Sequence, residues 1–293
     1  MPSVSEYVFA GAERLTHGPH AERALRDAEV LMMHVLGKDR AWILSHWHDE
    51  IDTHCSIPYR TLIERRRAGE PIQYITGEAE FYGLPFRVTP YVLIPRPETE
   101  HAVERVLELA AAFSAPGIPP TRIPPIRIID VGTGSGALAV ALASKLPHAA
   151  ITATELSPAA LEVARENAAR DGVAERIRFV EGDLLAPVAG ETFDIVVSNP
   201  PYVAEADRAS LAIEVREFEP AQALFAGVDG LAIYRLLIPQ AFVALTSGGF
   251  LVLEIGYGQE DAIRALLAQA GFAEISFTAD LQGIPRVACG QKP

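Results

Sequence analysis

The chain has 293 residues, a formal net charge of −13 and a hydrophobic fraction of 49%. This length predicts two domains, or one large domain with an appendage, at about 150 residues per domain. The sequence has no run of the roughly 18 apolar residues that a membrane helix needs, and no basic start of a signal peptide. We therefore expect a cytoplasmic protein that does not enter a membrane. The acidic balance disfavours stable nucleic-acid binding, because phosphate contacts usually require a basic surface.

The two cysteines, Cys55 and Cys289, lie far apart, and neither belongs to a CxxC pair. A disulfide is not expected in a reducing compartment, and the spacing indicates no metal site. We expect both thiols to have no chemical role.

Residues 1–75 are predicted to form a small helical domain. Apolar residues recur at helical spacing in 21–36, 41–47 and 59–69. The third of these segments carries a basic cluster, Arg60 and Arg65–Arg67, which could be a local nucleic-acid patch but is explained equally well as a solvated helix face. Small helices do not easily form a catalytic pocket, so we expect this domain to recognise the substrate.

The pattern then changes to a predicted β-hairpin. Residues 78–93 are rich in aromatic and β-branched side chains, with Gly83-Leu84-Pro85 as the expected turn. Pro97 is well placed to open a helix over 98–113. The proline-rich residues 114–125 predict a stiff, exposed connection.

From residue 126 onward, strands alternate with helices. The predicted strands are 126–131, 150–154, 177–180, 193–197 and 249–254, with 273–278 and 286–289 as a closing pair. The predicted helices are 137–146, 158–170, 230–245 and 259–270. Such alternation predicts an α/β fold with an open, mostly parallel sheet that is covered by helices.

A glycine-rich loop follows the first of these strands. It consists of Gly132, Thr133, Gly134, Ser135 and Gly136. Glycines allow a sharp turn and a close approach to a ligand, and the helix that follows offers free N–H groups to an anionic ligand group. Glu155 ends the next strand, where an acidic side chain can accept both hydroxyls of a ribose. The loop therefore predicts a nucleotide or nucleoside cofactor.

This loop does not identify the cofactor by itself. Gly132, Gly134 and Ala137 also satisfy the dinucleotide fingerprint, so both NAD and S-adenosylmethionine stay open. Asp130 at the start of the loop favours S-adenosylmethionine modestly, since a carboxylate suits its cationic methionine end.

A further acidic residue, Asp183, follows the third predicted strand. This position faces the adenine of the cofactor in such folds, where a carboxylate can accept the hydrogens of the exocyclic amine. The alternative interpretation is a surface turn, in which aspartate is common.

The fourth strand runs into Asn199, Pro200, Pro201 and Tyr202. Ligands of open α/β sheets bind outside the carboxyl ends of the strands, so this motif is expected beside the cofactor. An amide nitrogen is a poor nucleophile and must be aimed in line at a methyl sulfonium. The Asn199 side-chain oxygen and the Pro200 carbonyl can accept its two hydrogens, the prolines hold them stiffly, and Tyr202 can stack on the flat target. A dehydrogenase has no use for these acceptors, which excludes NAD and predicts nitrogen methylation.

The chain as a whole resembles the HemK/PrmC family of glutamine-N5 methyltransferases, which act on bacterial peptide-chain release factors. The similar segments are Pro71–Gly77, Glu80–Gly83, Ile94–Glu100, Asp130–Gly136, Asn199–Tyr202, Glu219-Pro220, Gly227, Asp229–Leu231, Glu254–Gly256 and Asp280–Gly283. They cover nearly the whole chain from about Ala21, so the resemblance is specific.

The resemblance implies a helical N-terminal domain that a β-hairpin joins to a class I, Rossmann-like, S-adenosylmethionine-dependent methyltransferase domain. The expected boundaries are 1–75, 76–97 and 98–293. It also implies site residues: Gly132–Gly136 and Glu155 for S-adenosylmethionine, Asp183 and Leu184 near its adenine, Asn199–Tyr202 for the substrate, and Asn199 against the cofactor as well.

The implied substrate is the glutamine of the Gly-Gly-Gln motif in class-1 release factors, and a monomer is expected. Two positions depart from the family pattern, because Glu155 stands where Asp is common and Leu184 where an aromatic residue can occur. Glu155 is one methylene longer than Asp, and Leu184 is expected to stack more weakly on the adenine. Arg96 and Pro97 are expected to shape the pocket and hinge, as is Phe81, for which core packing is an equal explanation.

Three other functions stay open at this point. The same chemistry could act on a glutamine of a ribosomal protein, since the motif recognises only the amide. An adenine-N6 DNA methyltransferase uses a similar motif, but the acidic charge argues against it. A binding protein without activity would have no use for an intact Asn199 and glycine loop.

Overall fold

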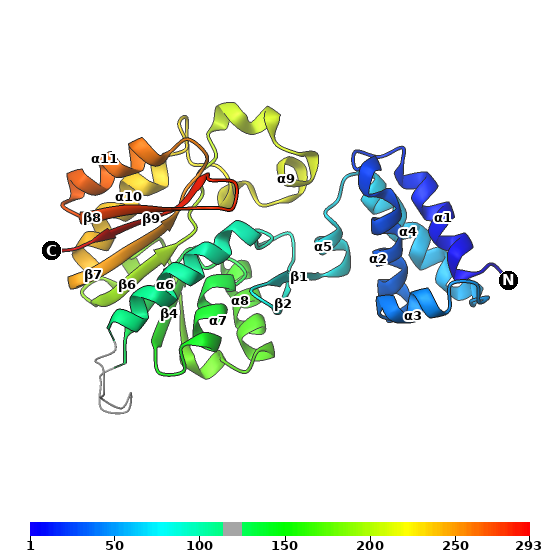
Figure 1. Cartoon of the computed structure of the whole chain (residues 1–293), viewed down its shortest axis with the longest axis horizontal. Coiled ribbons are helices and arrows are strands. Elements are labelled where there is room, and N and C mark those ends of the chain that lie inside the picture. Colours follow the sequence, from blue (N-terminus) through cyan, green and yellow to red (C-terminus); the bar gives the residue numbers. More distant parts are fainter. Residues whose placement is uncertain (114–124) are drawn as a thin grey trace. The chain divides into compact units, whose positions relative to one another are not determined.

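The computed structural model describes residues 1–113 and 125–293, which form two compact units (Figure 1). The helical unit comprises Met1–Glu78 together with Leu211–Phe218. The sheet unit comprises Ala79–Ser210 and Glu219–Pro293. The proline-rich connection predicted from 114 onward falls, apart from Pro125, outside the described residues. No helix in the described ranges is long and apolar enough to cross a membrane.

The helical unit is built from short helices around an apolar centre. These helices are α1 (Val4–Leu15), α2 (Ala24–Leu36), α3 (Arg40–Ser45), α4 (Ser56–Arg67), α5 (Ile72–Thr76) and α9 (Ile213–Phe218), with 3-10 turns η1 (Ala21–Arg23) and η2 (Thr53–Cys55). Val8, Leu31, Ile43 and Ile63 lie fully buried at its centre. The predicted helical N-terminal region is thus confirmed, and α1 and α5 are additional to the predicted helices.

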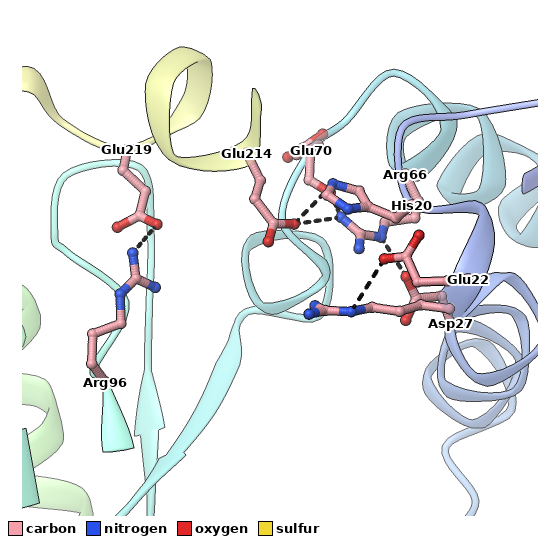
Figure 2. Close-up of polar contacts among 9 residues, drawn as sticks. His20, Glu22, Asp27, Arg66, Glu70, Arg96, Glu214 and Glu219 are labelled. Atoms are coloured by element: carbon pink, nitrogen blue, oxygen red, sulfur yellow. Dashed lines mark hydrogen bonds and ion pairs between the residues drawn. The ribbon is translucent and has the colours of Figure 1, made fainter. Parts of the chain in front are cut away.

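The basic cluster on α4 is not entirely solvated, which corrects the sequence-based interpretation. Tyr59, Ile63 and Arg66 share one face of the helix at spacings of four and three residues, and this face is buried. The Arg66 side chain is only 2% exposed, and its Nε donates to Asp27 at 2.6 Å. Its Nη1 donates to Glu214 at 3.0 Å (Figure 2). The same atom donates to the Glu70 carbonyl, also at 3.0 Å.

Helix α9 belongs to the helical unit although its sequence lies within the methyltransferase-like part of the chain. Glu214 receives Arg66, and the Nε2 atom of His20 lies 3.1 Å from the same carboxylate oxygen (Figure 2). The neighbouring Ile213 lies against Gly69, where an added Cβ would come within 3.1 Å of the isoleucine side chain. The helical unit is therefore completed by a segment that follows the Asn199 motif in the chain.

The sheet unit contains seven strands in the order β5-β4-β3-β6-β7-β9-β8. They are β3 (Arg127–Val131), β4 (Ala150–Glu155), β5 (Ile177–Glu181), β6 (Phe193–Ser198), β7 (Leu245–Glu254), β8 (Ala273–Ala279) and β9 (Pro285–Gln291). The strands from β5 to β7 are parallel, and β9 pairs antiparallel with both β7 and β8. The predicted parallel sheet and closing pair are confirmed.

Helices cover both faces of this sheet (Figure 1). They are α6 (Glu100–Ala112), α7 (Ala137–Lys145), α8 (Pro158–Arg170), α10 (Ala232–Ala244) and α11 (Glu260–Ala270), with 3-10 turns η3 (Pro97–Thr99), η5 (Ala174–Arg176), η6 (Ala186–Val188), η7 (Glu205–Ser210) and η8 (Ala221–Ala223). One apolar cluster joins α6, α7 and α8 to Ile128 and Ile195, and the other joins α10 and α11 to Ile129 and Val196. Neighbouring residues of β3 and β6 thus point to opposite cores, as expected for strands buried on both faces.

The hairpin is shorter than predicted, with β1 (Glu78–Phe81) and β2 (Leu84–Arg87). Its turn is Tyr82-Gly83, both with positive φ of 53° and 76°, so the predicted turn at Gly83-Leu84-Pro85 is wrong. Two consecutive left-handed residues give the twist that a two-residue hairpin needs. Phe81 is buried in the sheet-unit core, which favours its packing explanation.

The two arginines Arg66 and Arg67 provide a matched test of this burial. We expect Arg66→Met to lower the free energy of unfolding of the helical unit by about 3 kcal/mol, because it leaves Asp27 buried without its cation. Arg67→Met removes an ion pair with Glu64 whose side chains are 48% and 37% exposed, and should cost about 0–1 kcal/mol. Both tryptophans, Trp42 and Trp47, lie in the helical unit, so their fluorescence in urea reports its unfolding in the full chain. Equal effects of the two substitutions would contradict the buried role of Arg66.

Candidate active site

A pocket lies at the carboxyl ends of the central strands of the sheet unit. It is lined by most of the residues predicted from the sequence: Gly132, Thr133, Gly134, Ser135, Glu155, Asp183, Leu184, Asn199 and Pro201. The strand β3 lies between β4 and β6. The chain therefore adds β4 and β5 on one side of β3, and β6 and β7 on the other. Such a switch point opens a crevice at the carboxyl edge, which explains why residues from distant motifs meet there.

The glycine loop turns back sharply between β3 and α7. Gly132, Gly134 and Gly136 have φ angles of 73°, 57° and 84°, a conformation that other residues rarely adopt. The backbone N–H groups of Gly132 and Thr133 both donate to the Thr154 carbonyl at 2.9 Å, which fixes the loop against β4. Gly136 does not line the pocket; an added Cβ there would lie 3.1 Å from Ala164 on α8, so its smallness serves helix packing.

Asp130 ends in a buried carboxylate at the pocket wall. Its Oδ2 accepts from the Thr133 hydroxyl at 2.6 Å and from the Ala139 N–H at 3.2 Å. Its Oδ1 has no hydrogen-bond partner among the described residues, although the side chain is 1% exposed. Burial raises the pKa of Asp130 to about 7. An unsatisfied carboxylate oxygen beside a pocket fits a cationic group of a ligand.

Glu155 is held at the end of β4 by two backbone donors. Its Oε2 accepts from the Gly134 N–H and its Oε1 from the Ser157 N–H, each at 2.9 Å. Each carboxylate oxygen has further lone pairs, so both can accept hydroxyl hydrogens of a ligand in the pocket.

Asp183 and Leu184 follow β5 on the other side of the pocket. Asp183 is exposed and lines it, and Leu184 is half-buried with a φ of 47°. A β-unbranched side chain in the left-handed region costs on the order of 1 kcal/mol or more. The conformation turns Leu184 towards both the pocket and the apolar cluster under α10.

Asn199 lies directly after β6 with its amide oriented by a neighbour. Its Nδ2 donates to the Thr99 hydroxyl at 3.0 Å. Pro200 is buried and does not line the pocket, whereas Pro201 does. Tyr202 is not one of the described residues that line the pocket. Its hydroxyl donates to Glu254 at 3.2 Å. Burial raises the pKa of Tyr202, so its hydroxyl keeps its proton.

Two residues at the site carry roles that the sequence analysis did not assign. Thr99 lies in η3 and lines the pocket, and Glu254 ends β7 with 2% exposure. The Thr99 hydroxyl donates to Glu254 at 2.5 Å. A charge at the carboxyl end of the apolar run 250–253 was the available signal for Glu254. Thr99 carried no such signal, because a threonine beside a helix start is ordinary.

Arg96 also lines the pocket, as expected from the sequence. Its Nη2 donates to Glu219 at 2.5 Å, and the Glu219 side chain is 1% exposed (Figure 2). Pro97, the other residue of this pair, opens η3 and so leads the chain to Thr99.

Comparison with known proteins identifies the family. Residues 10–77 match the family model of the PrmC N-terminal domain, and residues 120–227 match that of the methyltransferase small domain. The release factor glutamine methyltransferase of Koribacter versatilis is 42% identical, with 91% of this chain and 90% of that protein covered. That of Geobacter sulfurreducens is 40% identical over 94% of both. The chain belongs to the release factor glutamine methyltransferase family.

Solved structures show the fold that this family member shares with more distant proteins. The human METTL16 catalytic domain in complex with an RNA hairpin, MAT2A 3′UTR hairpin 6, has a TM-score of 0.56 at 16% identity, covering 86% of this chain and 92% of that one. The N-terminal domain of human METTL16 in complex with SAH has a TM-score of 0.52 at 17% identity, covering 72% and 76%. At these identities the likeness concerns the fold alone, that of class I methyltransferases.

The buried Asp130 gives this glutamine methyltransferase family member a testable pH dependence. Folding raises the pKa of this carboxyl from 3.8 to about 7, so its contribution to stability is present at acidic pH and lost as the pH rises through 7. We expect Asp130→Asn to raise the free energy of unfolding of the ligand-free protein at about pH 8, by on the order of 1–3 kcal/mol, and less at about pH 5.5. The same substitution should weaken binding of S-adenosylmethionine.

Urea unfolding at both pH values measures the first effect, and calorimetric titration measures the second. Asp207→Asn, at an exposed aspartate of η7, is the control for loss of an aspartate charge at a site that is not buried. A pH-independent effect of Asp130→Asn would contradict the burial of a titrating carboxyl.

Proposed function

We propose that this protein transfers the methyl group of S-adenosylmethionine to the side-chain N5 of the glutamine in the Gly-Gly-Gln motif of class-1 release factors. The observation that carries the proposal is the meeting of Asn199 with Asp130 and Glu155 in one pocket. A carboxylate for a cationic amine, one for a ribose and an amide acceptor for a substrate nitrogen are the groups that this transfer requires. The names of the bacterial relatives support the glutamine substrate.

Residues around the glycine loop would hold the cofactor. The free Oδ1 of Asp130 suits the ammonium of its methionine part, and the Glu155 oxygens suit the ribose hydroxyls. Asp183 and Leu184 would receive the adenine. When bound, S-adenosylmethionine supplies an electrophilic methyl on a cationic sulfur.

Asn199 and Pro200 would aim the glutamine nitrogen. Because Asn199 Nδ2 is engaged by Thr99, its Oδ1 is the atom left to accept one hydrogen of the glutamine amide. The Pro200 carbonyl would accept the other. Both hydrogen bonds would strengthen as positive charge builds on the nitrogen. They would therefore stabilise the transition state more than the bound substrate. The bound cofactor would supply the methyl group with loss of its S–CH₃ bond as the N–CH₃ bond forms, and the glutamine nitrogen that Asn199 and Pro200 hold would then lose a proton to solvent. Stacking of Tyr202 on the amide stays a prediction.

The helical unit would recognise the release factor, with residues 1–75 as its main part. The acidic net charge supports a protein partner rather than a nucleic acid. We further propose that the protein acts as a cytoplasmic monomer, since its substrate belongs to translation.

Mass spectrometry of methylated products tests this function. Incubation with S-adenosylmethionine and a class-1 release factor should add one methyl group to the glutamine of the Gly-Gly-Gln peptide. A ribosomal-protein fraction and duplex DNA serve as competing substrates in parallel reactions. An unmodified release factor, with methyl groups on either competitor, would refute the proposal.

Asn199→Ala tests the aiming of the nitrogen. We expect kcat to fall by about 10²-fold or more, as for the loss of a positioned polar group at a reacting centre. Binding of S-adenosylmethionine should change little. Single-turnover kinetics and calorimetric titration separate the two effects. Turnover near that of the wild type would remove Asn199 from the mechanism.

A further inference from the structure

A chain of hydrogen bonds links Asn199 to a buried carboxylate behind the pocket. Asn199 Nδ2 donates to Thr99 Oγ1 at 3.0 Å, and Thr99 Oγ1 donates to Glu254 Oε2 at 2.5 Å. The residues come from the end of β6, from η3 and from the end of β7. Thr99 is 4% exposed and Glu254 2%, so water does not compete for these bonds.

The same carboxylate also holds the other end of the Asn199–Tyr202 motif. Its second oxygen, Oε1, accepts from the Tyr202 hydroxyl at 3.2 Å. Pro200 and Pro201, which lie between the two contacts, have fixed φ angles. Glu254 thus fixes both ends of a segment whose middle is already stiff.

The direction in which these hydrogen bonds are donated decides which end of the Asn199 amide faces the substrate. A hydroxyl has a single proton, and an ionised carboxylate can only accept. The Thr99 proton therefore points to Glu254, and only the hydroxyl lone pairs remain for Asn199. This arrangement places the NH₂ group of Asn199 towards Thr99 and leaves Oδ1 for a ligand. Without it, an asparagine amide could present either end, since its two ends are nearly isosteric.

We propose that Glu254 and Thr99 are positioning residues that fix the Asn199 amide with its oxygen towards the substrate nitrogen. This inference rests on the proposed function. It adds to that function the two residues that determine which end of the Asn199 amide faces the substrate. Neither residue is required to touch the substrate or to move a proton.

A protonated Glu254 would lose this control. It could donate to Thr99, whose own proton would then be free to point at Asn199. The amide would be stabilised in the reversed orientation, with its NH₂ group facing the NH₂ group of the glutamine. Two donors cannot form a hydrogen bond, so the substrate nitrogen would no longer be held.

The surroundings place this protonation in an accessible pH range. Burial raises the pKa of Glu254 to about 7, and the nearby Glu98 adds to the rise. The hydrogen bonds from Thr99 and Tyr202 and the charge of Arg286 act in the opposite direction. The Tyr234 hydroxyl donates to the Glu254 backbone carbonyl and not to its carboxylate, so the carboxylate oxygens stay available to Thr99 and Tyr202. The charge of Arg96 lowers the pKa of the neighbouring Tyr202.

A pair of substitutions at Thr99 tests the proposal without disturbing the shape of the site. Thr99→Val removes the hydroxyl and keeps the volume, whereas Thr99→Ser keeps the hydroxyl and is the control. We expect Thr99→Val to lower kcat by about 10- to 100-fold, as when a group that orients another is lost, and Thr99→Ser to stay within about threefold of the wild type. The Kd of S-adenosylmethionine should stay within about twofold in both, as expected if the effect is confined to the transition state.

Both variants are assayed with the Gly-Gly-Gln peptide and with the full release factor. Wild-type turnover in Thr99→Val, or an equal loss in Thr99→Ser, would overturn the inference while leaving the function intact. A wild-type protein that fails to methylate either substrate would instead refute the proposed function.

The pH profile of kcat tests the part of Glu254. We expect wild-type kcat to fall as the pH drops below about 7, since the Glu254 carboxylate then takes up a proton. The rate is measured at saturating S-adenosylmethionine, so that protonation of Asp130, which affects cofactor binding, does not limit it. Glu254→Gln should have a lower kcat and no such acidic limb. Glu98→Gln is the control, which should retain the limb at a slightly lower pH because it removes a charge that raises the pKa of Glu254. An acidic limb that persists unchanged in Glu254→Gln would overturn this role; if that variant fails to fold, the Thr99 pair still decides.

Discussion

The parallel pairing of β3 with its two neighbours is the constraint on which the rest of the structure depends. Val131 pairs with Thr154 of β4, and Asp130 pairs with Val197 of β6, so these strands end at one edge of the sheet. The glycine loop follows β3, Glu155 ends β4 and Asn199 follows β6, so these three parts of the pocket meet at this edge. The turns can deviate from regular structure because the strands beneath them are buried on both faces and are fixed by the cores.

Two buried carboxylates, Asp130 and Glu254, stand behind this edge, and both are destabilising when ionised. Burial raises the pKa of each to about 7. A neutral side chain of the same shape would avoid this cost. Their positions explain why charge is retained: one leaves an oxygen free for a cation at the pocket wall, and the other orders the hydrogen bonds that hold Asn199. The two carboxylates therefore lower the stability of the protein, but one provides an acceptor for a cation and the other fixes the orientation of the Asn199 amide.

Sequence patterns predicted the elements whose physics is local. The buried strands, the helix Pro158–Arg170 with its Ser157 cap, and the glycine loop all follow from periodicity, capping and the demand for positive φ. The hairpin turn was misplaced because Tyr82, an unusual residue for a left-handed conformation, occupies it. Glu254, Thr99 and Arg66 act through partners that lie far away in sequence, at 155 residues for Thr99 and Glu254 and 148 for Arg66 and Glu214. No local pattern encodes such pairings.

The compact helical unit includes α9 as well as the N-terminal residues. The family model of the N-terminal domain ends at residue 77, yet the compact unit also includes residues 211–218. Without them Arg66 would lose the Glu214 carboxylate, and Gly69 would lose the side chain of Ile213 that lies against it. The Asn199 motif is therefore followed within the chain by a segment that belongs to the unit proposed to recognise the substrate. The helical unit is therefore built from two separate parts of the chain, of which the second, Leu211–Phe218, lies within the sequence of the sheet unit.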